Sequence, residues 1–158
     1  MAKRLTFILY TAILLILTSC ESEYQTSLAK QEEYIDSYIA ANYSDCEIVF
    51  NDGVNRIVVN EGSGSPAEEG DIMSIYCAGY TFGSSGPESQ FTELDFSFTL
   101  GEDPIIEGLE LGLAGARAGE TCVILFTAKH GYGQSSLGVV PEATALAFLV
   151  YVKSVSKQ

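Results

Sequence analysis

Apolar and glycine positions in the last third of the chain follow an order that few small folds accommodate. Phe96, Phe98 and Leu100 alternate with polar residues, which predicts a strand with one buried face. The apolar, glycine-containing residues 105–113 come next and predict a short helix. The remaining motifs are Gly131-Tyr132-Gly133, Val139-Val140-Pro141 and Leu146-Ala147-Phe148. A strand, a short helix, an aromatic loop and a final strand in this order predict a small apolar cup on a curved sheet.

The strand pattern that precedes this cup predicts one α+β domain over residues 46–158. Asp52-Gly53 stands between two strand-like runs and predicts a β-hairpin. A glycine- and serine-rich stretch, residues 83–89, is expected to interrupt the strands. Further strands are expected at residues 72–80, 122–126 and 145–155. About five strands and one short helix in this order describe a curved antiparallel sheet wrapped on a helix.

An extra helix is expected in the segment that precedes this domain, residues 27–45. Leu28, Ile35 and Ile39 fall near one face at helical spacing, and charged residues surround them. The favoured interpretation is that this face packs on the chain's own domain. The alternative is a dimerisation arm, which would make the protein a homodimer.

The first residues predict a targeting signal rather than part of the fold. Lys3 and Arg4 precede a mostly apolar stretch, residues 5–17, that is too short to span a bilayer comfortably. Small residues then lead to Cys20 in a pattern that resembles a bacterial lipobox, whose cysteine is acylated. An ordinary signal peptide with Cys20 near the cut is the alternative.

The predicted organisation is therefore a signal peptide at residues 1–19 and a lipidated tether at residues 20–26. Lipidation at Cys20 would anchor the protein to a membrane of the cell envelope. The periplasmic side and the outer surface both remain open.

The charge and the cysteines narrow the possible partners. All 21 acidic residues lie after Cys20 with only six basic residues, so the mature chain carries a net charge of −15, which disfavours nucleic acid and anionic lipid. Cys46, Cys77 and Cys122 are odd in number, so at least one thiol stays unpaired. The single histidine, His130, is expected in a surface loop. We expect no metal and no cofactor.

In this order the motifs resemble those of the FKBP peptidyl-prolyl isomerases, over roughly residues 53–155. The resemblance implies an FKBP-like fold and catalysis of rotation about X-Pro bonds, a reaction slow enough on its own to limit folding. It also implies that the substrates are unfolded or nascent polypeptides.

The resemblance implies a set of pocket residues. The catalytic set would be Tyr76, Phe96, Ile106 through its backbone amide, Tyr132 and Phe148. The substrate-binding set would be Phe91, Ile105, Leu109 and Val140. Such a site suits the chemistry, because the barrier of about 18–20 kcal/mol comes from amide resonance and is lowered without a nucleophile or a proton transfer.

Three departures from the family pattern fall in this pocket. The chain has no tryptophan, so Leu109 stands where the family usually has a Trp floor. Phe91-Thr92 replaces the usual Phe-Asp pair, and Phe82 is an alternative match for the aromatic residue. Pro104 replaces a glutamate. Low or selective activity is therefore expected, and the alternative function is a catalytically weak FKBP-like chaperone or binding module in an envelope complex.

Overall fold

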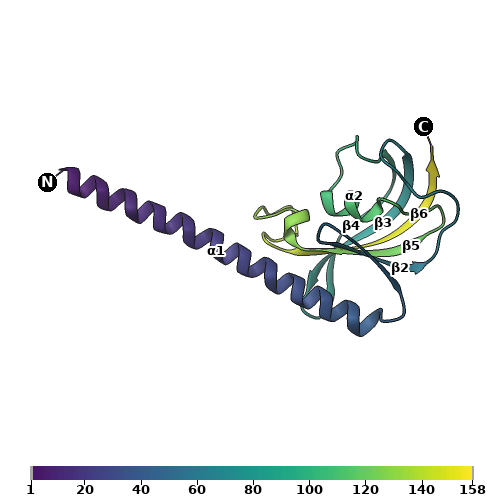
Figure 1. Cartoon of the computed structure of the whole chain (residues 1–158), viewed down its shortest axis with the longest axis horizontal. Helices are drawn as coiled ribbons and strands as arrows, with labels where there is room; N and C mark the ends of the chain where they lie inside the picture. Colours follow the sequence, from purple (N-terminus) through teal and green to yellow (C-terminus); the bar gives the residue numbers. More distant parts are fainter. Residues whose placement is uncertain (1, 158) are drawn as a thin grey trace.

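The computed structural model describes the backbone of residues 2–157 and the side chains of residues 21–157. A long N-terminal helix leads into a small domain built on one sheet (Figure 1). The elements are α1 (Ala2–Asn42), β1 (Glu47–Asn51), β2 (Val54–Asn60), β3 (Ile72–Gly83), β4 (Gly86–Thr99), α2 (Glu107–Leu113), β5 (Thr121–Phe126), the 3-10 turn η1 (Ala128–His130) and β6 (Ala145–Ser156).

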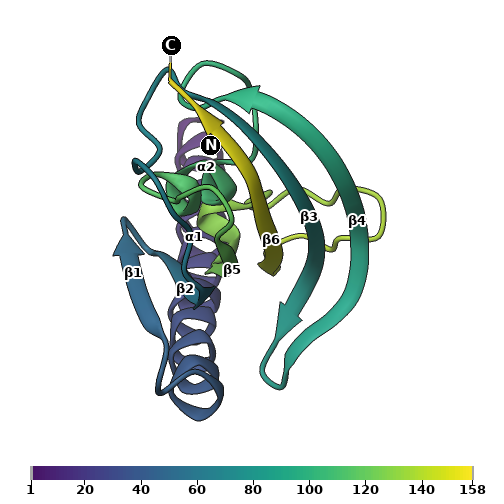
Figure 2. The same ribbon diagram turned by 90° about the vertical axis from the view of Figure 1, so that its right-hand side faces the viewer.

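All strand pairs are antiparallel, and the order across the sheet is β1-β2-β5-β6-β3-β4. The sheet curves around α2, as Figure 2 shows from the side of the strands. The predicted α+β class, with a curved antiparallel sheet on a short helix and an extra N-terminal helix, is confirmed. The sheet has six strands rather than about five.

Strand β4 begins ten residues earlier than the alternating pattern at Phe96 indicates. The expected interruption at residues 83–89 is a tight hairpin, in which Gly83 pairs with Gly86. Gly86 has φ +114°, a conformation that glycine adopts without steric cost. The predicted hairpin at Asp52-Gly53 is present, and both residues have positive φ as a type I′ turn requires.

The two faces of the sheet are separated by strict alternation along the strands. In β5, Cys122, Ile124 and Phe126 belong to the cluster on the α2 side, whereas Leu125 belongs to the cluster on the α1 side. Strand β6 alternates in the same way, with Phe148 on the α2 side and Ala147 on the α1 side. Side chains that alternate across a strand thus give the molecule two cores, one on each face.

Helix α1 closes one of these faces. Leu28 and Ile35 are 8% and 2% exposed, and Tyr38 meets the ring of Phe82 edge-on at 5.1 Å between centroids. Burying a side chain such as Ile35 contributes about 1.5–3 kcal/mol. The prediction that this helix packs on its own domain is confirmed.

The bounds of α1 differ from those predicted. The helix ends at Asn42, and the expected tether, residues 20–26, is helical because no glycine or proline interrupts it. The predicted signal peptide and the acylated Cys20 lie outside the residues whose side chains are described. Across the described residues, no helix has the length and apolarity needed to cross a membrane.

Helix α2 is held against the sheet along one face and by a buried arginine at its C-terminal end. A Cβ on Gly108 would lie 2.5 Å from the Phe126 ring, so the absence of a side chain lets the helix touch the sheet. At its C-terminal end, Arg56 donates to the carbonyls of Gly112 and Ala114 at 3.0 and 2.8 Å. Arg56 is itself buried beside Glu120 at 3.3 Å, which compensates its charge.

Candidate active site

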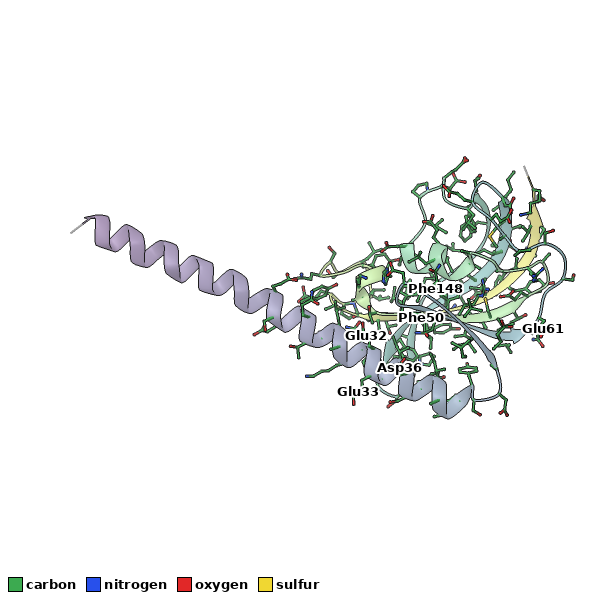
Figure 3. The ribbon with its side chains drawn as sticks, in the orientation of Figure 1. Glu32, Glu33, Asp36, Phe50, Glu61 and Phe148 are labelled. Atoms are coloured by element: carbon green, nitrogen blue, oxygen red, sulfur yellow. The ribbon has the colours of Figure 1, made fainter. Side chains whose placement is uncertain are left out.

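An apolar cavity of about 650 Å³ opens between α2, strands β3, β4 and β6, and the loop that follows η1. Its lining is Cys77, Phe91, Thr92, Leu94, Phe96, Pro104, Ile105, Ile106, Leu109, Tyr132, Leu137, Gly138, Val139 and Phe148. Figure 3 places Phe148 in the middle of the domain, below α2. A cavity of this size, mostly apolar with few polar groups, is typical of a ligand site.

Four aromatic side chains from β4, β6 and the loop after η1 form the walls. Phe91 meets Phe148 at 5.7 Å and 89° between ring planes, and it meets Tyr132 at 6.3 Å and 75°. Such edge-to-face pairs are the favoured geometry for aromatic rings. Gly79 makes room for them, because a Cβ there would lie 2.8 Å from both Phe91 and Phe148. Phe96 completes the wall from β4.

The floor comes from the start of α2. Leu109 is 3% exposed and lines the cavity, while Ile105 and Ile106 lie half-buried beside it. Ile106 precedes the first helical turn, and its carbonyl accepts the amides of Leu109 and Glu110. Within the described chain its own N–H has no acceptor, as expected for the start of a helix. This amide can therefore serve a carbonyl of a bound peptide.

Tyr132 contributes the one hydroxyl of the aromatic wall. Burial raises the pKa of Tyr132, so the phenol stays protonated and remains a donor. The ring of Tyr132 packs against Phe91 and the core of the α2 face. Thr92 stands at the position where the resemblance implied an aspartate, so no carboxylate is available there to orient the phenol.

Seven of the nine residues predicted from the sequence line this cavity, and the other two need correction. Tyr76 is wrong as a wall, because it lies on the opposite face of β3, where its hydroxyl donates to Glu93 at 2.6 Å. Its neighbour Cys77 lines the cavity instead. Val140 is 2% exposed in the core, and the preceding Val139 faces the cavity.

The alternatives considered for the aromatic wall are also resolved. Phe91 lines the cavity, whereas Phe82 lies on the other face of the sheet against α1. Phe98 and Leu100 are each 4% exposed in the core, as the alternation predicts. Sequence reasoning missed Leu94 and Leu137. The pairing of Leu94 with Cys77 across β3 and β4 explains why both lie together, and that register is invisible in the sequence.

His130 is not the surface residue that the sequence suggested. It is 2% exposed, and its Nδ1 lies 3.1 Å from the Glu107 carboxylate at the start of α2. Its Nε2 faces Gly53 of the β1–β2 turn, where a Cβ would lie 3.2 Å away. The histidine therefore joins the loop after β5 to α2 and to the first hairpin.

Two of the three described cysteines, Cys77 and Cys122, are buried and serve the structure. Cys46, Cys77 and Cys122 are free thiols. Burial raises the pKa of Cys77 to about 11 and that of Cys122 to about 12, so both are neutral at physiological pH. Over the part of the chain with described side chains, no cluster of three His, Cys, Asp or Glu could hold a metal ion.

Comparison with known proteins agrees with this geometry. A family profile described as "FKBP-type peptidyl-prolyl cis-trans isomerase" matches residues 63–153. FK506-binding protein 1 of Dictyostelium discoideum is 31% identical over 100 residues, which cover 62% of this chain and 94% of the relative. The peptidyl-prolyl cis-trans isomerase FKBP12 of Arabidopsis thaliana is 29% identical over 113 residues, covering 65% and 98%.

Solved structures show the same fold. The N-terminal domain of FKBP42 from Arabidopsis thaliana superposes with a TM-score of 0.64 at 20% identity, over 72% of this chain and 94% of that domain. The family profile and the sequence relatives place the chain among the peptidyl-prolyl isomerases, and the fold and the aromatic cup agree with that class. The chain belongs to the FKBP family, and it is an FKBP-type peptidyl-prolyl cis-trans isomerase.

Proposed function

We propose that this isomerase assists protein folding in the bacterial cell envelope, where it acts on X-Pro bonds of unfolded or nascent polypeptides. The observation that carries the activity is the cavity itself, with Phe91 and Phe96 from β4, Phe148 from β6 and Tyr132 from the loop after η1 converging on it. Such a hollow is wide enough for a proline ring and the residue before it.

The mechanism follows from what the cavity offers a twisted amide. Apolar walls exclude water, which otherwise stabilises the planar and polar form of the X-Pro bond. The free N–H of Ile106 and the hydroxyl of Tyr132 are donors for substrate carbonyls beside the rotating bond. A hydrogen bond that is stronger in the twisted state than in the planar state lowers the rotation barrier by about 0.5–1.5 kcal/mol, which raises the rate by up to roughly tenfold. No covalent step is required.

The activity is tested with the processed protein and a proline peptide, by protease-coupled turnover or by NMR exchange. Phe96→Ala removes one wall and is expected to lower kcat/KM about tenfold. Phe50→Ala is the matched control, because Phe50 is 68% exposed on β1 and does not line the cavity. Equal losses in both variants, or a wild-type rate equal to buffer, would contradict an isomerase site in this cavity.

The envelope location is supported by the sequence of the first twenty residues. Residues 17–19 and Cys20 resemble a lipobox after a short apolar stretch, and the acidic mature chain suits an extracytoplasmic surface. Cells fed a labelled fatty acid should incorporate it into the wild-type protein and not into Cys20→Ala, which should leave the membrane fraction. Unlabelled wild-type protein would contradict the anchor without touching the isomerase activity.

A binding module without useful turnover is the second candidate, and the leucine floor favours it. Leu109 fills the cavity base but lacks the flat face on which a proline ring stacks. In that case the protein would suppress aggregation of an unfolded client while its turnover equals that of buffer. If Phe96→Ala instead abolishes both turnover and the protection of the client from aggregation, the same cavity carries both activities.

A further inference from the structure

One polar side chain of α1 reaches across to the loop that carries part of the cavity wall. We call residues 128–143 the pocket loop, because Tyr132, Leu137 and Val139 lie within it and line the cavity. Gln31 lies on the face of α1 that packs on the domain and is 3% exposed. Its position between Leu28 and Ile35 makes it a buried polar residue within an otherwise apolar contact.

Gln31 binds both ends of the pocket loop with one amide group. Its Oε1 accepts the backbone N–H of Ala128 at 2.8 Å, and its Nε2 donates to the carbonyl of Ala143 at 2.7 Å. The two partners fix the orientation of the amide, since one offers a donor and the other an acceptor. Ser27, one helical turn earlier, accepts a further bond from Nε2 at 3.2 Å.

The residue bound at the far end of the loop has an unusual backbone. Ala143 has φ +50°, a left-handed conformation that residues other than glycine rarely adopt. Its N–H donates to the carbonyl of Gly133 at 2.8 Å, and its own carbonyl is the one that Gln31 holds. A conformation of this kind persists where surrounding contacts over-determine it. Gln31 supplies one of those contacts.

The helix also approaches the aromatic end of the loop. A Cβ on Gly133, next to Tyr132, would lie 3.8 Å from the hydroxyl of Tyr24, two helical turns before Gln31. Gly133 donates in turn to the carbonyl of Ala128 at 2.8 Å. Ala128, Gly133 and Ala143 therefore form one chain of hydrogen bonds, and Gln31 closes it at both ends.

We propose that Gln31 is a positioning residue for catalysis, which clamps the pocket loop from α1 so that Tyr132 and Val139 face the bound proline peptide. The proposal rests on the isomerase activity of the cavity. It makes α1 part of the working enzyme, because the clamp comes from a helix that lies outside the segment matching the family, residues 63–153. Figure 1 shows α1 running beside this loop on the opposite side of the sheet from α2.

Two variants of Gln31 separate the two halves of the clamp. Gln31→Leu keeps the size of the side chain and removes both bonds, so the loop should open and KM should rise about three- to tenfold with kcat nearly unchanged. Gln31→Glu keeps the acceptor for Ala128 and loses the donor to Ala143. Amide hydrogen exchange should therefore quicken at Ala143 and Gly133 while Ala128 stays protected.

Ile35→Ala is the matched control, because Ile35 packs α1 on the sheet and lies one turn from Gln31 without a hydrogen bond to the loop. It should lower thermal stability at least as much as Gln31→Leu and leave KM and loop exchange unchanged. The clamp is refuted if Gln31→Leu keeps wild-type KM and exchange, or if Ile35→Ala raises KM as much. Exchange reports on the loop even if no turnover is found, so a failure of the activity is distinguished from a failure of the clamp.

Discussion

The two faces of the sheet are built from the same strands, but one is closed by a packed core and the other leaves an open cavity. On the α1 face, Ile57, Phe82, Leu125 and the tyrosines of the helix close into a continuous core. On the α2 face, a larger core stops short of closure and leaves about 650 Å³ open above Phe148. The comparison teaches that both faces contribute a packed core to stability and only the α2 face offers substrate contacts, with the proposed Gln31 clamp as the link between them.

The largest expected effect comes from opening the closed face. Phe82→Ala removes a 2% exposed ring that contacts Tyr34 and Tyr38, and it should lower the free energy of unfolding by about 3–5 kcal/mol. Urea unfolding measures this loss. If the faces are separate, kcat/KM of the protein that remains folded should stay within about twofold of wild type. A collapse of kcat/KM in fully folded protein would break the comparison.

A smaller effect is expected from closing the open face. Gly79→Ala places a Cβ against the rings of Phe91 and Phe148, which must shift toward the cavity. Overpacking of this kind costs about 1–3 kcal/mol of stability, and the displaced rings should lower kcat/KM about tenfold. Turnover and urea unfolding are measured side by side. An unchanged kcat/KM would show that these rings are not part of the proline site.

Removing one hydroxyl from the open face tests its chemistry without disturbing its shape. Tyr132→Phe should lower kcat/KM about fivefold, the equivalent of about 1 kcal/mol for one hydrogen bond, and leave the unfolding free energy unchanged. Tyr151→Phe is the control, because Tyr151 is 44% exposed on β6 and does not line the cavity. Equal rates for Tyr132→Phe and wild type would leave catalysis to the Ile106 amide alone.

The smallest effect concerns the thiols, one of which lies in the cavity wall. Because burial raises the pKa of Cys77 to about 11 and of Cys122 to about 12, their reactive thiolate form is scarce at pH 8. A thiol reagent should label Cys46 in the native protein, and the other two only after unfolding, as read by mass spectrometry of peptides. Labelling of Cys77 at the rate of Cys46 would mean that the cup wall is open to solvent.

The sequence predicts the fold and most of the cup because these depend on local order. Alternation at Phe96, Phe98 and Leu100 indicates a half-buried strand, and Asp52-Gly53 fixes a turn through its own backbone preference. The family motifs then place Ile106 and Tyr132 beside the cavity. Strands, turns and motifs that depend on a few neighbouring residues can therefore be predicted from the sequence.

The errors arise where local order leaves two equivalent choices. Alternation in β3 assigns Tyr76 and Cys77 to opposite faces, but which face meets the cup depends on the pairing with β4. Val139 and Val140 pose the same choice in the pocket loop. The burial of His130 cannot be inferred from its neighbours in the sequence, because its partner, Glu107, lies 23 residues away in the chain.

The role of Gln31 depends on contacts still further apart in the chain, 97 and 112 residues from their partners. The sequence does hold one trace of it, a glutamine in the apolar stripe between Leu28 and Ile35. A polar residue in such a stripe needs buried hydrogen-bond partners. The apolar stripe therefore indicates that Gln31 has buried hydrogen-bond partners, but only the tertiary structure shows that these partners lie in the pocket loop.

The unbroken course of α1 has a mechanical consequence for an enzyme fixed at its N-terminal end. With the proposed attachment at Cys20, the helix rises about 16 Å before it reaches Gln31, at 1.5 Å per residue. A rigid helix of this length, unlike a flexible linker, would hold the opening of the cavity at a fixed distance from the membrane and in a fixed orientation. Inserting a single residue into this part of α1 would rotate the domain relative to the membrane anchor by about 100°, the turn per residue of an α-helix.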